Sequence, residues 1–588
     1  MRRIMPHAVS GRRRLDSRAA PLAALVAAAA LLVACTSSSG DGAPSTFTIP
    51  PSAGAPESGS GSAVPPSSGG AATAVQSEAP QSQAAQSEAA QSEAAQSEAA
   101  QATGLPDAVR SAMENATFEH SSFGLLVQDA TTGENVADLR SQEIFESGST
   151  AKLFAAAAML DTYGPDATFS TPIYRTGDVT AGAVQGALVL VGAGDQNLGG
   201  RGVLDGQIQY EPIDHTYAGI PGAAETPGDP LAGIKKLAAD VKASGITSAG
   251  DVVVDDRLFD VQQTWEQHPI SSIVVNDNVI DVLSTPGEVG QPATLDWRPQ
   301  ASGWTVRSEV TTGAAGSQPS AQVSLEAPGQ LVVTGSVPAG GGPALAIYPL
   351  PDPASFARSA LIDELTKASV TVNAPPTGAN PVAQLPARES YQSADQVAAL
   401  VSAPLSETVT MVLKTSHNPA ADLFTCMLAV RSDSTSCNDG LAAEYATAAK
   451  AGIGPSVVYL FDGAGTSPAR FTPAAGVQLI DWMSGQSWGA QLKDALPNLG
   501  VSGDLALATG TPAQGKIQAK TGTRAAPDPG GVKVLIQTRT MVGYLEAASG
   551  RDLRFALMVQ NMSSEPGPNL FAFLDDVTAV AVAIQQSY

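Results

Sequence analysis

Positive charge is scarce in this sequence. Its 588 residues include 32 Lys and Arg against 56 Asp and Glu, which gives a formal net charge of −24. A polyanion would be repelled by such a chain, so we do not expect a nucleic-acid partner. Aromatic residues are also few, at 5%, whereas Gly (57) and Pro (42) are plentiful. That composition is typical of a loop-rich chain with low-complexity segments rather than of a compact helical bundle.

The start of the chain lacks an apolar run long enough to span a membrane. Arginine-rich sequence precedes an apolar run from Ala19 to Ala34, which is shorter than the ~20 residues a span needs. The run ends in Leu-Val-Ala-Cys35, which resembles a bacterial lipobox. That resemblance implies cleavage before Cys35 and lipidation of its thiol, leaving the protein tethered to the membrane and facing the cell wall. An uncleaved transmembrane anchor is the alternative.

A low-complexity segment follows the predicted signal peptide (1–35). Residues 36–104 are mostly Ser, Gly, Pro, Ala and Gln, and they end in repeated Gln-Ser-Glu-Ala-Ala pentads. A period of five rotates apolar positions around a helix, so no stripe can pack and we predict a disordered, solvated spacer. The remaining chain is too long for one core, so we expect several domains or an inserted one.

The first chemical motif opens a strongly apolar segment. Ser and Gly at 147–149 indicate a turn, and the residues from Ala151 to Leu160 predict a helix buried on all sides. Ser149 and Lys152 are three residues apart and would share one face of that helix. Burial would lower the pKa of the lysine, so it could accept the hydroxyl proton. The pair predicts a nucleophile beside its base, although Ser-x-x-Lys alone recurs by chance.

A second motif, Ser416-His417-Asn418-Pro419, follows another apolar segment. Asn418 is placed to cap a helix that has Pro419 in its first position. Ser416 and Asn418 would then project from the loop. Capping alone would explain Asn418, and we expect His417 to be an exposed loop residue.

A third motif lies in the alternating segment 516–523, which predicts a strand. Gly522 would allow another backbone to approach closely, and an extended peptide could pair along this strand. Lys520 adds positive charge, and the hydroxyls of Thr521 and Thr523 can bond a terminal carboxylate. An ordinary charged edge strand is the alternative.

In this order, the three motifs resemble the triplet of penicillin-binding proteins and serine β-lactamases. The long gap between Lys152 and Ser416 is closer to the D-alanyl-D-alanine carboxypeptidase/endopeptidases, the low-molecular-mass class C penicillin-binding proteins, which carry a large insertion there. Similar stretches extend the resemblance over nearly all of 105–588, namely 188–195, 252–260, 271–278, 461–465 and 542–544.

The resemblance implies an α/β fold with a penicillin-binding/serine β-lactamase-like catalytic domain interrupted by one or more large inserted domains. We expect the catalytic domain at 105–170 and 400–588, and the insertion at 171–399. Its sheet would include a hairpin within 122–140 and a second hairpin that joins 542–544 to 553–561 through Ser549-Gly550.

Catalytic roles also follow from the resemblance. Ser149 would attack the D-Ala carbonyl, Lys152 would take its proton, and Ser416 would relay a proton to the leaving group. Backbone N–H groups of Ser149 and Thr523 would form the oxyanion hole. Water would then release the acyl-enzyme, and the reaction would need neither a metal nor a cofactor.

The remaining motif residues would bind substrate, a peptidoglycan stem peptide. Asn418 would contact the peptide, and the strand Lys520-Thr521-Gly522-Thr523 would align it, with Lys520 and Thr523 holding the carboxylate of the leaving residue. β-Lactam antibiotics would act as acylating inhibitors of such a site.

Two other functions are compatible with parts of the pattern. A serine β-lactamase shares the triplet but normally lacks so large an insertion. A non-catalytic wall-binding scaffold lipoprotein would have no reason to retain every motif side chain.

Two further features concern the rim of the site and the cysteines. After Thr523 the chain continues through residues 524–531, where the family usually turns into its next strand. Cys35, Cys426 and Cys437 are the only cysteines. Outside the cytosol the last two could form a disulfide, and two free buried thiols are the alternative.

Overall fold

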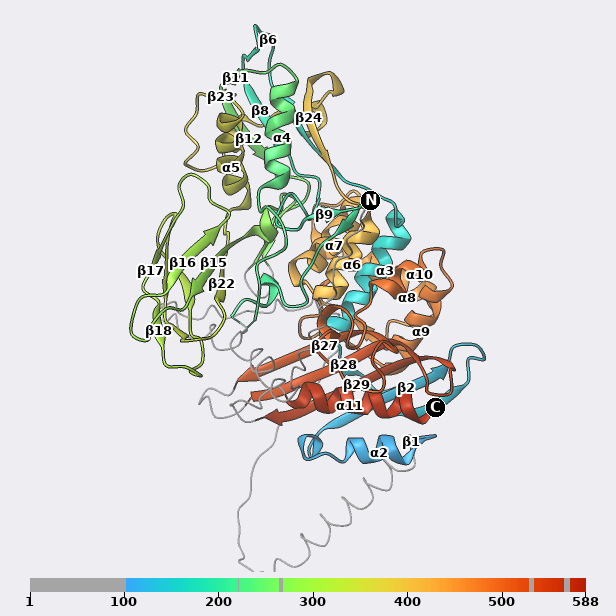
Figure 1. Cartoon of the computed structure of the whole chain (residues 1–588). Coiled ribbons are helices and arrows are strands. Elements are labelled where there is room, and N and C mark those ends of the chain that lie inside the picture. Colours follow the sequence, from blue (N-terminus) through green and yellow to red (C-terminus); the bar gives the residue numbers. More distant parts are fainter. Residues whose placement is uncertain (1–101, 220–221, 264–267, 528–533, 565–571) are drawn as a thin grey trace, which may run out of the picture. The chain divides into compact units, whose positions relative to one another are not determined.

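Figure 1 shows the chain as a computed structural model that describes residues 102–588, apart from 220–221, 264–267, 528–533 and 565–571. The predicted signal peptide, Cys35 and the spacer lie outside the described residues. From Thr103 onward the chain forms one compact unit. Within the described part, no helix combines the length and the apolar character needed to cross a bilayer.

One sheet joins the two ends of the described chain. Its strands are β1 (Ala102–Thr103), β2 (Ser122–Asp129), β3 (Asn135–Leu139), β27 (Ile517–Pro527), β28 (Val534–Glu546) and β29 (Asp552–Ser564). They run in the order β1-β3-β2-β29-β28-β27, and all pairs from β3 to β27 are antiparallel. Both predicted hairpins are therefore present, and β27 forms an edge of the sheet (Figure 1).

Helices pack on this sheet and bury the middle of it. Consecutive residues of β29 from Phe555 to Val559 are fully buried, which requires cover on both faces because side chains alternate along a strand. Helix α9 (Pro473–Ser484) contacts β2, β28 and β29, and Ala556 and Met558 share its core. Helix α11 (Ala572–Ser587) also contacts β28 and β29, and it packs against α2 (Asp107–Met113).

A helical lobe surrounds the predicted buried helix. That helix, α3 (Lys152–Tyr163), contacts α6 (Leu405–Thr415), α7 (Asn418–Arg431) and α8 (Gly440–Lys450), while α10 (Gly489–Ala495) packs on α6. Residues 152–160 of α3 are each at most 2% exposed, so the prediction of a helix buried on every side is confirmed. Cys426 of α7 and Cys437 are joined by a disulfide.

The long segment between the first two motifs leaves and re-enters this lobe through neighbouring strands. Strand β5 (Ser170–Arg175) pairs antiparallel with β24 (Gln396–Val401). Together with β8 (Ala187–Val191) and β12 (Asp251–Asp255) they form the sheet β12-β8-β5-β24. We propose that this strand pair marks the limits of the inserted region at 171–399.

The inserted region has a hydrophobic core of its own, drawn from residues between Ile173 and Ala398. Helices α4 (Ala232–Ala243) and α5 (Pro353–Lys367) pack on each other there, with α4 against β24 and α5 against β12. The rest of the region is largely β-structure: β15 (Val279–Thr285), β16 (Thr294–Arg298), β17 (Thr305–Ser308), β18 (Thr311–Gly313), β19 (Gln322–Ala327), β20 (Gln330–Thr334), β21 (Ser336–Pro338) and β22 (Ala344–Pro349).

Glu444 on α8 provides a test of how the helical lobe is packed. It is fully buried, one carboxylate oxygen accepts a hydrogen bond of 2.7 Å from Thr425 Oγ1, and burial raises its pKa from 4.5 to about 8. The unfolded chain releases this proton at lower pH than the folded chain. The free energy of unfolding therefore decreases as the pH rises from 4.5 to about 8, by about 1.4 kcal/mol per pH unit. Glu444→Gln should remove that loss.

Denaturant unfolding at several pH values between the two pKa values measures this effect. We expect the stability of Glu444→Gln relative to the unmodified protein to grow as the pH rises. Glu309→Gln, which changes an exposed glutamate, is the matched control and should leave the pH profile unchanged. If the free energy of unfolding of the unmodified protein and of Glu444→Gln changed with pH in the same way, Glu444 would have the same pKa in the folded and unfolded chain.

Candidate active site

The first motif folds so that its serine and lysine touch. Residues Gly148–Ala151 form a 3₁₀ turn that leads into α3 at Lys152. Because a 3₁₀ helix has three residues per turn, positions i and i+3 lie above one another. Lys152 Nζ is 2.7 Å from Ser149 Oγ. Ser149 is partly exposed whereas Lys152 is fully buried, so the hydroxyl is the part of the pair that a substrate can reach.

Two carbonyl oxygens hold the Lys152 amine from other segments. Nζ donates to Asn418 Oδ1 at 2.6 Å and to the Ala464 carbonyl at 3.0 Å. These oxygens can only accept, whereas the Ser149 hydroxyl can accept or donate. A neutral amine would use its two N–H groups on the carbonyls and turn its lone pair toward the Ser149 hydroxyl. The geometry therefore suits proton transfer from serine to lysine.

The second motif differs from the prediction in the residue that caps helix α7. His417, not Asn418, is the N-cap of α7, and its Nδ1 accepts a hydrogen bond of 3.1 Å from the Ala420 backbone N–H. The Asn418 side chain therefore turns to Lys152. Ser416 ends α6 in a left-handed conformation with φ of 57°. His417 is 4% exposed because the inserted region covers it, so the expectation of an exposed loop residue was wrong.

The third motif lies directly against the turn that carries Ser149. A Cβ on Gly522 would come within 2.4 Å of the Ser147 carbonyl oxygen and 2.8 Å of the Ser149 backbone nitrogen. A Cβ on Gly148, whose φ is +48°, would lie 2.9 Å from the Thr523 nitrogen. Only glycines allow this approach. This close approach brings the backbone nitrogens of Ser149 and Thr523 near each other, where the two segments cross.

Asp504 is paired with Lys520. Lys520 is fully buried, and its Nζ lies 3.2 Å from Asp504 Oδ2 and 2.8 Å from the Thr521 carbonyl oxygen. Thr521 Oγ1 also donates to Asp504 Oδ2. The Thr521 hydroxyl proton is therefore committed to Asp504, whereas the sequence predicted that it would bond a substrate carboxylate.

Thr523 is in a different position from Thr521. It is exposed, and its Oγ1 accepts a hydrogen bond of 2.8 Å from Arg539 of β28, the residue paired with it in the sheet. Its own hydroxyl proton can still be donated. Lys520 and Thr523 of the edge strand and Arg539 of the neighbouring strand β28 thus bring two cations and a hydroxyl together, and Asp504 compensates part of that charge.

Sequence reasoning missed three polar residues of the site: Asp504, Arg539 and Tyr217. Tyr217 lies near the Ser416 side chain, and its charged neighbours include Asp504 and Arg539. Asp504 lies in a short 3₁₀ turn, Gly503–Leu505, that no recognisable sequence pattern marks. A signal for Tyr217 was present, because the sequence Asp-His-Thr-Tyr at 214–217 places several chemically active side chains in a loop rich in Gly and Pro.

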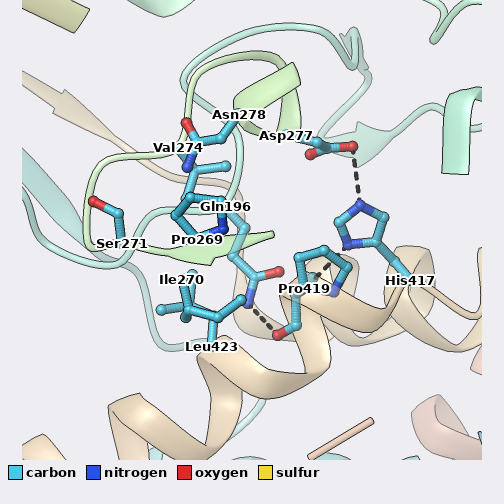
Figure 2. A pocket seen from close by; sticks show the side chains of 11 residues that line it. Gln196, Pro269, Ile270, Ser271, Val274, Asp277, Asn278, His417, Pro419 and Leu423 are labelled. Atoms are coloured by element: carbon cyan, nitrogen blue, oxygen red, sulfur yellow. Dashed lines mark hydrogen bonds and ion pairs between the residues drawn. The ribbon is translucent and has the colours of Figure 1, made fainter. Parts of the chain in front are cut away.

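A pocket lies behind the second motif, at the junction with the inserted region. Figure 2 shows it lined by inserted residues such as Pro269 and Ile270 and by residues of α7 such as Leu423. At its edge an Asp277 oxygen lies 3.3 Å from His417 Nε2 (Figure 2).

His215, Asp277 and His417 have ligand atoms within 4.8 Å of one another, a spacing that could suit a metal ion. Their hydrogen bonds point to another arrangement. His417 Nδ1 accepts from a backbone N–H, so Nε2 carries the proton. Burial lowers the pKa of His215, but Asp281 and Asp277 on its two nitrogens raise it to about 10. Neither ring presents a lone pair to a cation, so the group is an ion-pair network.

Comparison with known proteins identifies the family. The sequence model of the "D-Ala-D-Ala carboxypeptidase 3 (S13) family" matches residues 105–580. The chain belongs to this S13 family. Membership confirms the predicted family and the prediction of a serine-type hydrolase of the D-Ala-D-Ala carboxypeptidase kind. It favours neither the β-lactamase nor the scaffold alternative.

Relatives of the S13 protein support the same assignment. It is 28% identical over 509 residues to a D-alanyl-D-alanine carboxypeptidase of an Actinomadura species, covering 82% of this chain and 85% of that one. Penicillin-binding protein 4 of Haemophilus influenzae matches with a TM-score of 0.60 at 17% identity, over 80% of this chain and 99% of that one. The predicted penicillin-binding fold with additional domains is thereby confirmed.

The buried Lys520 predicts a pH dependence for this S13 enzyme. Burial lowers its pKa below the usual 10.5, even though Asp504 favours the charged form. Once the amine is neutral, it no longer attracts a carboxylate. We expect KM for peptides that end in a free carboxylate to rise at a pH below 10.5, and steady-state kinetics across the alkaline range would measure it.

Two comparisons isolate the Lys520 charge from other titrating groups. A peptide amidated at its C-terminus should lack the rise in KM, because it has no carboxylate. Lys520→Arg should move the rise to higher pH, since a guanidinium stays charged. Identical pH profiles for the free and amidated peptides would rule out Lys520 as the carboxylate-binding group.

Proposed function

We propose that this S13 protein cleaves D-alanyl peptide bonds in peptidoglycan stem peptides through an acyl-enzyme on Ser149. The observation that carries the proposal is the contact of 2.7 Å between the partly exposed Ser149 hydroxyl and the buried Lys152 amine, which Asn418 and Ala464 orient. An isolated buried lysine would be costly, and this one is placed where it can exchange a proton with a reachable hydroxyl.

Acylation begins with attack of Ser149 Oγ on the D-Ala carbonyl carbon. Lys152 takes the hydroxyl proton, using the lone pair that its two carbonyl partners leave directed at Ser149. The developing oxyanion is bound by the backbone N–H groups of Ser149 and Thr523, which the Gly148–Gly522 approach places close together.

Expulsion of the leaving D-residue requires a proton on its nitrogen. Ser416 donates that proton and regains one from the Lys152 ammonium, while Asn418 contacts the acyl side of the substrate. Lys520 and the Thr523 hydroxyl hold the leaving carboxylate, which replaces Asp504 as the partner of Lys520. Water then hydrolyses the ester on Ser149, and β27 as an edge strand can pair with the extended peptide.

Penicillin provides a direct test, because a β-lactam acylates such a serine and cannot leave the site. Haemophilus influenzae penicillin-binding protein 4, a structural relative at TM-score 0.58, has been solved with a bound β-lactam. We expect intact-mass measurement of a soluble form of this enzyme to show one persistent drug adduct. Ser149→Ala should show none, because it lacks the nucleophile.

Other outcomes separate the remaining functions. An intact drug and no adduct on the folded protein would refute the acyl-enzyme and favour a scaffold. Rapid destruction of the drug without a lasting adduct would favour a β-lactamase. Thr150→Ala is not a suitable control because Thr150 is buried beside the site, so we choose the exposed Ser317→Ala, which should form the adduct normally.

We also propose that the enzyme is exported and held at the outer face of the membrane by lipid on Cys35. The lipobox-like tetrad and the spacer 36–104 support this arrangement, since a solvated chain would let an anchored enzyme reach the wall. Action on peptidoglycan places the site outside the cytoplasm.

Cys35→Ser tests the anchor. We expect the unmodified protein in the membrane fraction with labelled fatty acid attached, and the variant without label. Cys437→Ser, which leaves Cys35 in place, should still be labelled. Labelling that persists in Cys35→Ser would refute lipidation at this residue.

A further inference from the structure

Four arginines are buried in the described part of this chain, and three of them have a carboxylate partner. The N···O distances of these ion pairs are 2.8 Å or less: Arg201 with Asp277, Arg358 with Asp251, and Arg554 with Asp481. The fourth is Arg539, which has no carboxylate within ion-pair distance among the described residues. A buried cation without a counter-ion is costly, so a site that keeps one is suited to an anion from outside the protein.

The Arg539 guanidinium uses little of its hydrogen-bonding capacity within the described chain. One of its nitrogens, Nη1, donates to Thr523 Oγ1 at 2.8 Å, and Nε is buried without an acceptor among the described residues. A guanidinium carries five N–H donors in a planar fork that matches the two oxygens of a carboxylate. The fork of Arg539 therefore has donors left for a ligand.

The carboxylate of this site, Asp504, is committed to a different cation. Its Oδ2 lies 3.2 Å from Lys520 Nζ and accepts a hydrogen bond from Thr521 Oγ1. Burial lowers the pKa of Arg539, and the negative charge of Asp504 offsets this only in part. One carboxylate thus serves two buried cations, and the free site keeps an excess of positive charge.

This excess charge lies next to the turn that carries Ser149. Thr523 of β27 is directly opposite Arg539 of β28, so their side chains are on the same face of the sheet. The Thr523 side chain is exposed, and its backbone nitrogen is 2.9 Å from the place of a Cβ on Gly148, the residue before Ser149. A ligand that accepts the Thr523 hydroxyl proton is therefore beside Ser149 and within reach of the Arg539 fork.

We infer that Arg539 is a specificity-determining residue, which together with Thr523 binds the terminal carboxylate of the leaving residue and selects substrates with a free C-terminus. The inference rests on the proposed function and adds a second cation to Lys520. One carboxylate oxygen accepts the Thr523 hydroxyl proton, and the Arg539 fork donates to the carboxylate from the side of β28. Arg539 thereby gains the counter-ion that the described chain does not supply.

Arg539→Gln removes the charge and keeps a polar side chain. Two N-acyl-D-Ala thioesters measure its effect: the leaving thiol of one ends in a free carboxylate, and in the other that carboxylate is amidated. A thioester is reactive enough for the amide to be measured as well. We expect kcat/KM for the free acid to fall at least about tenfold, mainly through KM, because a charge-assisted hydrogen bond is lost. The value for the amide should stay within about twofold.

Two further variants control for the loss of a buried arginine. Arg554→Gln is the matched control, since Arg554 is a buried arginine of β29 in the same sheet and has Asp481 as its partner. It should leave the acid-to-amide ratio of kcat/KM unchanged. Arg539→Lys keeps a positive charge but loses the fork, so it should lower kcat/KM for the acid by at least about threefold and spare the amide. This variant decides the question if Arg539→Gln does not fold.

The acid-to-amide ratio separates binding of the carboxylate from a structural role. An unchanged ratio in the deciding Arg539 variant would overturn the inference, whether both values of kcat/KM fall equally or neither falls. An equal change of the ratio in Arg554→Gln would also overturn it, because the effect would then follow from the loss of any buried arginine. The proposed function fails on a different result, namely peptide cleavage retained by Ser149→Ala.

Discussion

The proposed active site depends on one constraint: the buried amine of Lys152 must lie between oxygen atoms from three parts of the chain. Its serine partner is three residues away, but Asn418 and Ala464 are 266 and 312 residues distant. Burying an amine without partners would cost several kcal/mol. The helical lobe, and the start of α7 in particular, must therefore be assembled before this site exists.

The second constraint is how closely two backbones approach. The turn that carries Ser149 lies against β27 only because neither Gly148 nor Gly522 has a Cβ. That approach sets both the proposed nucleophile, Ser149, and the backbone N–H groups of Ser149 and Thr523 relative to the edge strand. Asp504 is the ion-pair partner of Lys520 in the free enzyme. In the proposed mechanism a substrate carboxylate would therefore have to replace a carboxylate that is already present.

Sequence patterns predicted the parts of this site that depend on residues close together in the chain. The apolar run of α3, the spacing of Ser149 and Lys152, the strand around Lys520 and both hairpins were visible in the sequence. The positions of Asp504 and Arg539 were not, because each depends on long-range packing. The local pattern at 214–217 marked Tyr217 as a chemically active side chain but not its place beside the second motif. Arg539 lies opposite Thr523 only through the register of a hairpin whose connecting length the sequence does not specify.

Predictions about the second motif failed at His417 for the same physical reason. The sequence correctly predicted an N-cap residue in this loop, but that residue is His417 and not Asn418. The inserted region buries the imidazole ring of His417 and supplies Asp277 as its partner. Exposure cannot be judged from a loop alone when the covering segment lies over a hundred residues upstream.

The pairing of β5 with β24 has a consequence for the order in which the chain folds. Contact between Lys152 and Asn418 closes a loop of 266 residues in an unstructured chain. Once the inserted region has folded, its ends are neighbours, and the effective loop shrinks to roughly 35 residues. Closing the shorter loop costs about 2 kcal/mol less entropy. The insertion thus makes the two halves of the catalytic domain near in space although they are far apart in sequence, and its early folding would speed assembly of the catalytic site.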